Sequence, residues 1–475
     1  MTQPKARQTL SDSVIKAIQA KYPQGFLSVL PEDLVNYGKD WTRVFPPNPS
    51  AIVFPRSTAE VASFLAFCNE NSIQVVPSGG RTGLSGGAVA TQGEVVLSLV
   101  RMNRMGKLDT LAHTLEVEAG VVTEAVHERC HAENLTWPVD FASKGSSHVG
   151  GNIATNAGGV KVIRYGLTRN WILGLTAVTM EGQVLKLNGA LEKNNTGLDL
   201  RHLLIGSEGV LAVITEATLK LVKNPESLDV FFFALEDIPA VLKLFHEVRR
   251  GPFQTMAFEF LTRNCLRVLD EIKSLRPPFS DLDSHQAYVL LEVERPESSN
   301  GQKLLDEWLA GLFERGLVHD GVLAQSPKEA KELWGLRENI SESLAHRGFV
   351  HKNDIALPVA SLESFIDDLK NYFSDQHSGF EVFIFGHIGD GNLHVNTMKP
   401  DKMDQDEFVK RCKKIDQGLF ALIQKYRGSI SAEHGIGLLK KDALGFSRTH
   451  EEIVLMKQIK KVFDPKGLLN LNIGP

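Results

Sequence analysis

The chain has 475 residues, 43% of them hydrophobic and 23% charged, so it is long enough for two or three folding units and too apolar for an intrinsically disordered protein. Its formal net charge of −5 gives no basic footprint for nucleic-acid phosphates. The longest apolar runs fall far short of the roughly 18 residues of a transmembrane helix, and the N-terminus lacks the residue order of a secretory signal.

The first half of the chain is predicted to be β-rich with interspersed helices. A helix is expected at residues 13–22, and the proline-rich run 46–49 indicates a domain edge. Ser57 and Glu60 have the spacing of a capping box and precede a helical apolar pattern. The expected strands are residues 73–76, 94–100, 115–121, 172–180, 183–187 and 211–221.

The second half of the chain has a different texture, in which strands alternate with long helical patterns. The expected strands are residues 230–235, 288–294 and 381–385, and the expected helices are 239–250, 303–315, 327–346, 362–373, 406–426 and 451–463. This spacing predicts an α+β sheet layer with helices on one face. We therefore expect a helical lead-in at 1–45, domains at 46–225 and 226–428, and a C-terminal segment at 429–475.

Glycines gather in two short windows, with six of the 40 between residues 79 and 93 and seven between 145 and 174. Glycine allows positive φ and close approach to a ligand, and successive N–H groups form a concave nest for anions. The run 77–83 follows a predicted strand, so we interpret it as a phosphate cradle, with tight turns of a β-rich domain as the alternative. Neither window contains the Rossmann or P-loop glycine motif.

Three ordered motifs resemble a known flavoprotein superfamily. They are Pro77-Ser78-Gly79-Gly80-Arg81-Thr82-Gly83, Gly150-Gly151-Asn152-Ile153-Ala154-Thr155-Asn156-Ala157-Gly158-Gly159 and Leu203-Leu204-Ile205-Gly206-Ser207-Glu208-Gly209. They are similar to the FAD-binding domain of the vanillyl-alcohol oxidase / p-cresol methylhydroxylase (PCMH) superfamily. Within it, the sequence is closest in pattern to the FAD-linked D-2-hydroxyacid dehydrogenases, which oxidise D-2-hydroxyglutarate, D-lactate or glycolate.

The resemblance implies an α+β protein with a PCMH-type FAD-binding domain of two α/β subdomains at 46–225. It also implies an α+β substrate or cap domain with an antiparallel sheet, and a helical C-terminal segment that completes the active site. FAD is expected to bind noncovalently, because the first loop lacks the histidine that some relatives bond to flavin. The residues that the resemblance assigns to FAD are Pro77, Ser78, Gly79, Gly80, Arg81, Thr82, Gly83, Ser85, Gly150, Asn152, Thr155, Asn156, Gly158, Gly159, Glu208, Gly209, Ile214 and Asn470. The tail keeps Asn470 but lacks the lysine usual in relatives.

A second motif places two histidines around an Asp-Gly pair. Asp390-Gly391 between apolar runs predicts a two-residue hairpin turn, which sets His387 directly opposite His394 with Cβ atoms about 4.5–5.5 Å apart. Asn396 then lies on the same face. Both imidazoles can bind one ion, with hydrogen-bonded core histidines as the alternative reading.

A divalent ion usually needs a third protein ligand, and Glu433 in the run 431–435 is the candidate. The resemblance implies that His387, His394 and Glu433 hold a divalent metal. Mixed nitrogen and oxygen ligands suit zinc and leave manganese, cobalt or iron open.

The predicted substrate grip centres on an arginine. Arg337 and Ser341 are four residues apart in a helical pattern and hence on one face, and a guanidinium matches a carboxylate. Without the resemblance, the preferred interpretation of Arg337 is an ordinary surface or ion-pair arginine. The resemblance implies that Arg337, Ser341, Lys352, Asn396 and His434 contact the substrate, and two cations favour a diacid.

The resemblance implies an FAD-dependent oxidoreductase that converts a D-2-hydroxy acid, D-2-hydroxyglutarate before D-lactate, to the 2-oxo acid. In this scheme a metal assists removal of the hydroxyl proton by His434, and a hydride passes to flavin N5. The alternatives are a glycolate- or D-lactate-oxidising subunit of a larger complex, and a redox-neutral FAD transferase like alkyl-dihydroxyacetone-phosphate synthase. That transferase has consecutive histidines in its cap, where this chain has Gly386-His387-Ile388-Gly389.

The remaining expectations concern partners and location. An electron acceptor such as electron-transfer flavoprotein or a quinone is implied, a homodimer is one option, and no nucleic acid is expected. The four cysteines lie far apart without a CxxC pair, which predicts neither an iron–sulfur site nor a disulfide scaffold. A reduced cytoplasm is therefore the expected location.

Overall fold

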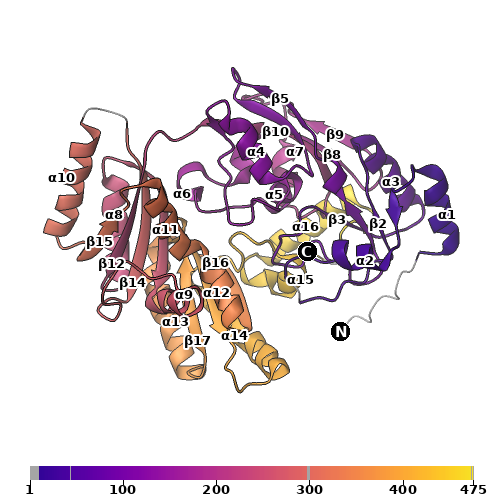
Figure 1. Cartoon of the computed structure of the whole chain (residues 1–475). Helices are drawn as coiled ribbons and strands as arrows, with labels where there is room; N and C mark the ends of the chain where they lie inside the picture. The colour runs from indigo at the N-terminus through magenta and orange to yellow at the C-terminus, as the bar shows by residue number, and fades with distance from the viewer. Residues whose placement is uncertain (1–9, 43, 297–299, 472, 474–475) are drawn as a thin grey trace. The chain divides into compact units, whose positions relative to one another are not determined.

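The computed structural model describes residues 10–42, 44–296, 300–471 and 473. These residues form two compact units, each assembled from separate stretches of chain (Figure 1). The first unit comprises Met1–Gly158, Leu167–Asn224 and Glu433–Pro475. The second comprises Gly159–Gly166 and Pro225–Ala432, so a short excursion of the chain after Gly158 belongs to the second unit.

The first unit begins with a four-stranded sheet in the order β1 (Leu27–Ser28), β2 (Ala51–Val53), β4 (Val95–Ser98) and β3 (Val75–Ser78). Strands β2 and β3 run parallel to β4, and β1 is antiparallel to β2. The accompanying helices are α1 (Asp12–Lys21), α2 (Pro31–Tyr37) and α3 (Thr58–Glu70). Helix α3 starts where the sequence predicts, because the Ser57 side chain accepts a hydrogen bond from the backbone N–H of Glu60.

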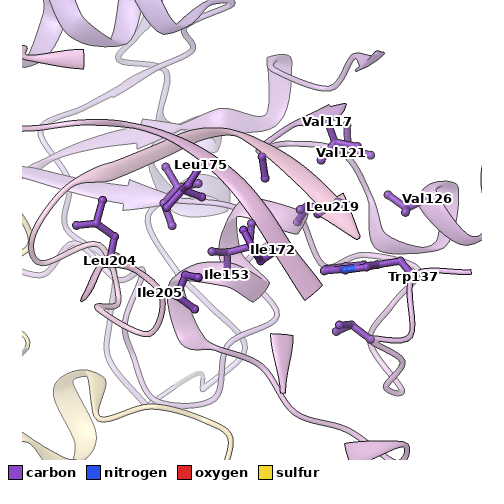
Figure 2. Packing of buried hydrophobic residues seen from close by; sticks show 14 of the residues in the cluster. Val117, Val121, Val126, Trp137, Ile153, Ile172, Leu175, Leu204, Ile205 and Leu219 are labelled. Carbon is purple, nitrogen blue, oxygen red and sulfur yellow. The ribbon is translucent and has the colours of Figure 1, made fainter. Parts of the chain in front are cut away.

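A five-stranded antiparallel sheet forms the rest of the first unit, in the order β5 (Met105–Asp109), β6 (Thr114–Glu118), β10 (Val213–Lys220), β8 (Ile172–Val178) and β9 (Val184–Leu187). Helices α4 (Thr123–His131), α5 (Val149–Thr155) and α7 (Leu200–Leu204) accompany it, with the short pair β7 (Leu135–Thr136) and β11 (Val222–Lys223). Figure 2 shows its core, in which Trp137, Ile153 and Leu219 are buried together. The C-terminal elements are α15 (Gly437–Lys440) and α16 (His450–Phe463).

The second unit is built on one seven-stranded antiparallel sheet. Its order is β15 (Asp320–Leu323), β12 (Leu228–Leu235), β14 (Ala287–Glu294), β13 (Gln254–Thr262), β17 (Glu381–Gly386), β18 (Asn392–Met398) and β16 (Val350–Ala356). Its helices are α6 (Val162–Tyr165), α8 (Ile238–Arg250), α9 (Arg263–Lys273), α10 (Gly301–Glu314), α11 (Pro327–Glu338), α12 (Ile340–Arg347), α13 (Leu362–Gln376) and α14 (Gln405–Lys425).

Helices cover both faces of this sheet, so the expectation of helices on one face is wrong. Phe232 of β12 belongs to a core shared with α9, α11 and α12. Its neighbour Phe231 points to the opposite face and meets Trp308 of α10 edge to face. The reason is that β12 is apolar at successive positions, and a strand that is apolar on both sides needs cover on both faces.

The predicted helix at 327–346 is two helices in the structure. Asn339 ends α11 and begins α12, and its side-chain amide donates to the carbonyl of Gly335. An asparagine amide competes with the backbone for hydrogen bonds, which favours a break at this position. No helix among the described residues is both long enough and apolar enough to cross a membrane.

Candidate active site

The two glycine-rich loops of the first unit lie against each other. A Cβ added at Gly80 would lie 2.2 Å from the carbonyl oxygen of Ser146, so only glycine fits at this contact. A Cβ at Gly79 would lie 3.7 Å from the Cα of Gly151. Gly151 itself has open space where its side chain would be. The second loop therefore leaves backbone accessible to a ligand at Gly151.

Buried polar atoms next to these loops fit a polar cofactor. Within the described residues, Ser78 Oγ and His148 Nδ1 are buried without a hydrogen-bond partner. Burial, with a smaller effect of the Arg81 charge, lowers the pKa of His148 to about 4, so the imidazole is neutral near pH 7. Buried polar groups normally have partners, and a bound cofactor is one way to supply them.

Most residues predicted to bind FAD are found on or beside these loops. Pro77 and Ser78 end β3, residues 79–85 form the loop that follows, Gly150 to Thr155 lie in α5, and Ile214 lies in β10. Gly159 is the exception, because it begins the excursion into the second unit. The roles of all these residues in cofactor binding stay predictions.

Glu208 and Asn470 tie parts of the first unit together. The Glu208 carboxylate accepts hydrogen bonds from the backbone N–H groups of Ile436 at 2.8 Å and Gly437 at 2.9 Å. Asn470 donates its amide to the carbonyls of Gly87 at 3.1 Å and Glu208 at 2.8 Å. Burial raises the pKa of Glu208. Both residues thus join the loops to the C-terminal segment, a structural task that the sequence motif does not reveal.

Glu433 and His434 lie in the first unit, next to the second glycine-rich loop. A Cβ at Gly158 would lie 2.7 Å from Glu433 Oε1, so the carboxylate packs directly against the end of that loop. A Cβ at Gly435 would lie 2.7 Å from the Glu208 carboxylate. The run that carries both predicted residues is therefore fixed at two points by glycine contacts.

The histidine hairpin of the second unit has a different register from the predicted one. His394 pairs with Phe385, not with His387, and a 3-10 turn at Ile388–Asp390 separates the two strands. A Cβ at Gly391 would lie 2.0 Å from the carbonyl oxygen of Leu357, so this glycine permits close packing of a neighbouring segment. The predicted two-residue turn is therefore wrong, because tertiary packing overrides the local turn signal.

The two imidazoles nevertheless come together. Their ring centroids are 5.9 Å apart, and a ring nitrogen of His387 lies within 4.8 Å of one of His394. Nδ1 of His387 lies 2.7 Å from Oε1 of the buried Glu259, and Nδ1 of His394 lies 3.8 Å from Oδ1 of the buried Asp354. A carboxylate behind Nδ1 is the usual support of a metal-binding histidine, which presents Nε2 to the ion.

Arg337 shares the carboxylate that supports His387. Its Nε donates to Glu259 Oε2 at 2.8 Å, and its guanidinium lies 5.1 Å from the ring centre of Phe385. Burial by itself would raise the pKa of Glu259, but the charges of His387 and Arg337 outweigh it and hold that pKa below its ordinary value. In the described part of the chain, Nη1 and Nη2 of Arg337 have no hydrogen-bond partner.

Lys352 and Asn396 lie on the same sheet face as the histidine of β18. Lys352 pairs directly with Asn396, and Asp354 pairs with His394, so these four side chains share one face. Ser341 is exposed in the first turn of α12, beyond the break at Asn339. Arg337 lies in α11 and Ser341 in α12, so the prediction that they lie in one helix is wrong.

Sequence reasoning missed Glu259 as a site residue and did not single out Asp354. Glu259 is the one charged residue of β13, and a lone buried charge in a strand of otherwise uncharged residues is a usable signal. Asp354 lies two residues after Lys352, which the resemblance did mark.

Comparisons with known proteins agree with the observed fold and with an FAD-binding domain in the region of the glycine-rich loops. Residues 224–472 match the family described as "FAD linked oxidases, C-terminal domain", and residues 49–188 match "FAD binding domain". A protein of Xanthomonas citri pv. viticola named "D-2-hydroxyglutarate dehydrogenase" is 44% identical over 97% of this chain and 96% of its own length. One of the same name from Stutzerimonas stutzeri is 43% identical over 92% and 94%.

Among solved structures, p-cresol methylhydroxylase with substrate bound has a TM-score of 0.74 at 16% identity, covering 99% of this chain and 98% of its own, which shows a shared fold. These findings confirm the predicted mixed fold with a PCMH-type FAD-binding domain, the FAD cofactor, and the resemblance to FAD-linked D-2-hydroxyacid dehydrogenases. The chain belongs to the FAD-linked oxidases and is an FAD-dependent oxidoreductase.

Proposed function

We propose that this chain oxidises D-2-hydroxyglutarate, and less efficiently D-lactate, to the corresponding 2-oxo acid. The observation that carries the proposal is the Glu259 carboxylate, which supports His387 on one side and Arg337 on the other. A 2-hydroxy acid has a hydroxyl group, which a metal held by histidine can bind, and a carboxylate, which an arginine can bind. Glu259 orients one residue of each kind. The names of the relatives support the choice of D-2-hydroxyglutarate.

Each absent group has a set of residues that suits it. FAD would be held noncovalently by the two glycine-rich loops, and a divalent metal by His387 and His394 with Glu433 as third ligand. Zinc suits this mixed set of nitrogen and oxygen ligands. When bound, FAD accepts the electron pair of the oxidation and the metal acts as a Lewis acid toward the hydroxyl group.

The chain's own side chains bind and orient the substrate. Arg337 and Lys352 bring two positive charges, which match the two carboxylates of a diacid better than the single one of D-lactate. Ser341 and Asn396 are hydrogen-bonding groups for the substrate. His434 accepts the hydroxyl proton on an imidazole nitrogen as general base, a role that histidine has more often than any other side chain.

The proposal extends to the partners of the reaction. An external acceptor, electron-transfer flavoprotein or a quinone, would reoxidise bound FAD, and the protein works in the cytoplasm, with a homodimer as one option for its assembly. The comparisons give no better support to a subunit of a larger complex or to a redox-neutral transferase.

The test is anaerobic reduction of the FAD-loaded protein by D-2-hydroxyglutarate, D-lactate, D-malate and glycolate, followed as loss of the flavin absorbance. D-2-Hydroxyglutarate should bleach the flavin fastest, and the L enantiomer should not bleach it. A chelator should abolish the reaction, and added zinc should restore it. If none of the four acids reduces the flavin, the proposed function is wrong.

A further inference from the structure

Residues 159–166, here called the excursion, connect a cofactor loop to the second unit. The part of the second glycine-rich loop that belongs to the first unit ends at Gly158, directly before the excursion. The chain returns to the first unit at Leu167. The excursion contains the single turn of α6 and ends at Gly166, which has a positive φ of 75°. The contacts of the excursion within the second unit indicate its role.

The first anchor of the excursion is a buried ion pair. Lys161 Nζ donates to Oε1 of Glu292, a buried residue of β14, and lies 5.0 Å from the ring centre of Trp334. An ion pair that is taken out of water depends on its geometry, because either charge without its partner is strongly unfavourable. Lys161 is therefore held firmly at this point of the sheet.

The same carboxylate also holds the helix that carries Arg337. Nε1 of Trp334 donates to Oε2 of Glu292 at 2.9 Å, and Trp334 lies on α11, three residues before Arg337. Arg337 in turn is bonded to Glu259 of the adjacent strand β13. Helix α11 is thus fixed to two neighbouring strands by two buried carboxylates, and one of them is shared with Lys161.

A second anchor joins the excursion to the histidine loop. A Cβ at Gly389 would lie 2.7 Å from Cδ1 of Ile163 in α6, and 3.2 Å from Cβ of Phe258. Ile163 therefore packs on the turn between His387 and His394. The excursion contacts both groups that the proposed function uses in this unit, the substrate arginine through α11 and the histidines through their turn.

We propose that Lys161 and Glu292 are positioning residues, which set α11 and hence the guanidinium of Arg337 for the substrate carboxylate. Through the excursion, the segment that directly follows the second cofactor loop becomes part of the substrate-binding framework. The inference rests on the proposed function for its substrate. Neither residue touches the substrate, so their effect must appear as altered substrate binding with the cofactor still in place.

The central variant is Lys161→Met, which keeps the length of the side chain and removes the charge. Lys161→Arg restores a cation that can pair with Glu292. Arg295→Met is the matched control, because Arg295 is three residues from Glu292 and forms an ion pair of similar burial with Asp229 at 2.8 Å. If Lys161→Met does not fold, the double variant Lys161→Met/Glu292→Gln, which leaves no unpaired charge, takes its place.

Two measurements on the FAD-loaded protein decide the matter. In anaerobic stopped-flow reduction, Lys161→Met should raise the D-2-hydroxyglutarate concentration for half-maximal rate about tenfold, and change the limiting rate by less than about threefold. Lys161→Arg and Arg295→Met should stay near wild type, and the Kd of FAD should be unchanged in all variants. Hydrogen exchange of the α11 amides should become faster in Lys161→Met but not in Arg295→Met.

The outcomes separate this inference from the proposed function. If no hydroxy acid reduces the wild-type flavin, the proposed function fails, and hydrogen exchange of α11 still tests the positioning role. If Lys161→Met, or the double variant in its place, matches Arg295→Met in substrate dependence, the inference is overturned. Unchanged exchange of the α11 amides in these variants overturns it as well.

Discussion

Oε1 of Glu259 lies 2.7 Å from Nδ1 of His387, and the other oxygen of the same carboxylate accepts a hydrogen bond from Nε of Arg337. One buried group therefore orients a proposed metal ligand and a proposed substrate ligand. Because the carboxylate is almost completely buried, both contacts are shielded from competing water. A change at Glu259 should affect metal and substrate together.

Glu259→Gln should weaken metal binding about 10- to 100-fold, since the neutral amide supports the His387 imidazole less well than a carboxylate. The measurement is a zinc titration of the metal-free protein against a chelating indicator. Glu294→Gln is the control, because Glu294 lies at the end of β14 and its carboxylate accepts only a long bond, 3.4 Å, from the backbone of Glu226 among the described residues. Equal zinc affinity in both variants would contradict the assignment of His387 as a ligand.

His434→Ala should slow anaerobic flavin reduction by D-2-hydroxyglutarate about 10²- to 10⁴-fold, the usual contribution of a general base. FAD should remain bound, because the segment that carries His434 is held through Glu208 and the backbone of Ile436. His450→Ala, at the exposed start of α16, should keep the wild-type rate. A His434→Ala rate within threefold of wild type removes this residue from the proton transfer.

Two glycine substitutions test two separate roles of glycine in the cofactor loops. One role is close packing of one loop against the other, and the second is access of FAD to the backbone. Gly80→Ala should destabilise the protein even without FAD, because its Cβ would overlap the carbonyl of Ser146. Gly151→Ala should leave the stability of the FAD-free protein nearly unchanged and still weaken FAD binding, since its Cβ enters the open space beside the loops.

Thermal unfolding and fluorescence titration with FAD measure both effects. The control is Gly311→Ala in α10, where a Cβ also meets no atom within 4 Å and helix propensity favours alanine. Normal FAD affinity in Gly151→Ala would show that the cofactor does not approach this backbone.

The glycine-rich loops could be predicted from the sequence because the residues that indicate them are close together in the chain. Residues 77 and 78 end strand β3 and residues 79–83 directly follow it, and the contact of Gly80 with Ser146 explains the glycine at that position. Helix α3 and its Ser57 cap are local in the same way.

The centre of the candidate site could not be predicted, because its contacts join distant parts of the chain. Glu259 is 78 residues from Arg337 and 128 residues from His387 in sequence. The predicted register of the histidine hairpin was wrong for a related reason. Asp390-Gly391 is a strong local turn signal, but the packing of Gly391 against Leu357 decides where the strands end.

The neutral, buried imidazole of His148 should make the stability of the first unit depend on pH. Burial, reinforced by Arg81, holds the pKa of His148 at about 4 in the folded protein, compared with about 6.5 in an unfolded chain. Between these two values the unfolded state binds the extra proton and the folded state does not. The free energy of unfolding therefore falls as the pH is lowered from about 6.5 to about 4, and nothing further is lost from this group below that range.

From pH 7.5 to 4.5, this group alone should reduce the free energy of unfolding by about 2.5 kcal/mol. His148→Gln removes the titrating group, so its loss of stability over the same interval should be smaller than that of wild type by about this amount. Urea unfolding at the two pH values measures the difference, with the exposed His202→Gln as control. Parallel losses in wild type and His148→Gln would mean that the imidazole is already protonated in the folded protein, contrary to its burial beside Arg81.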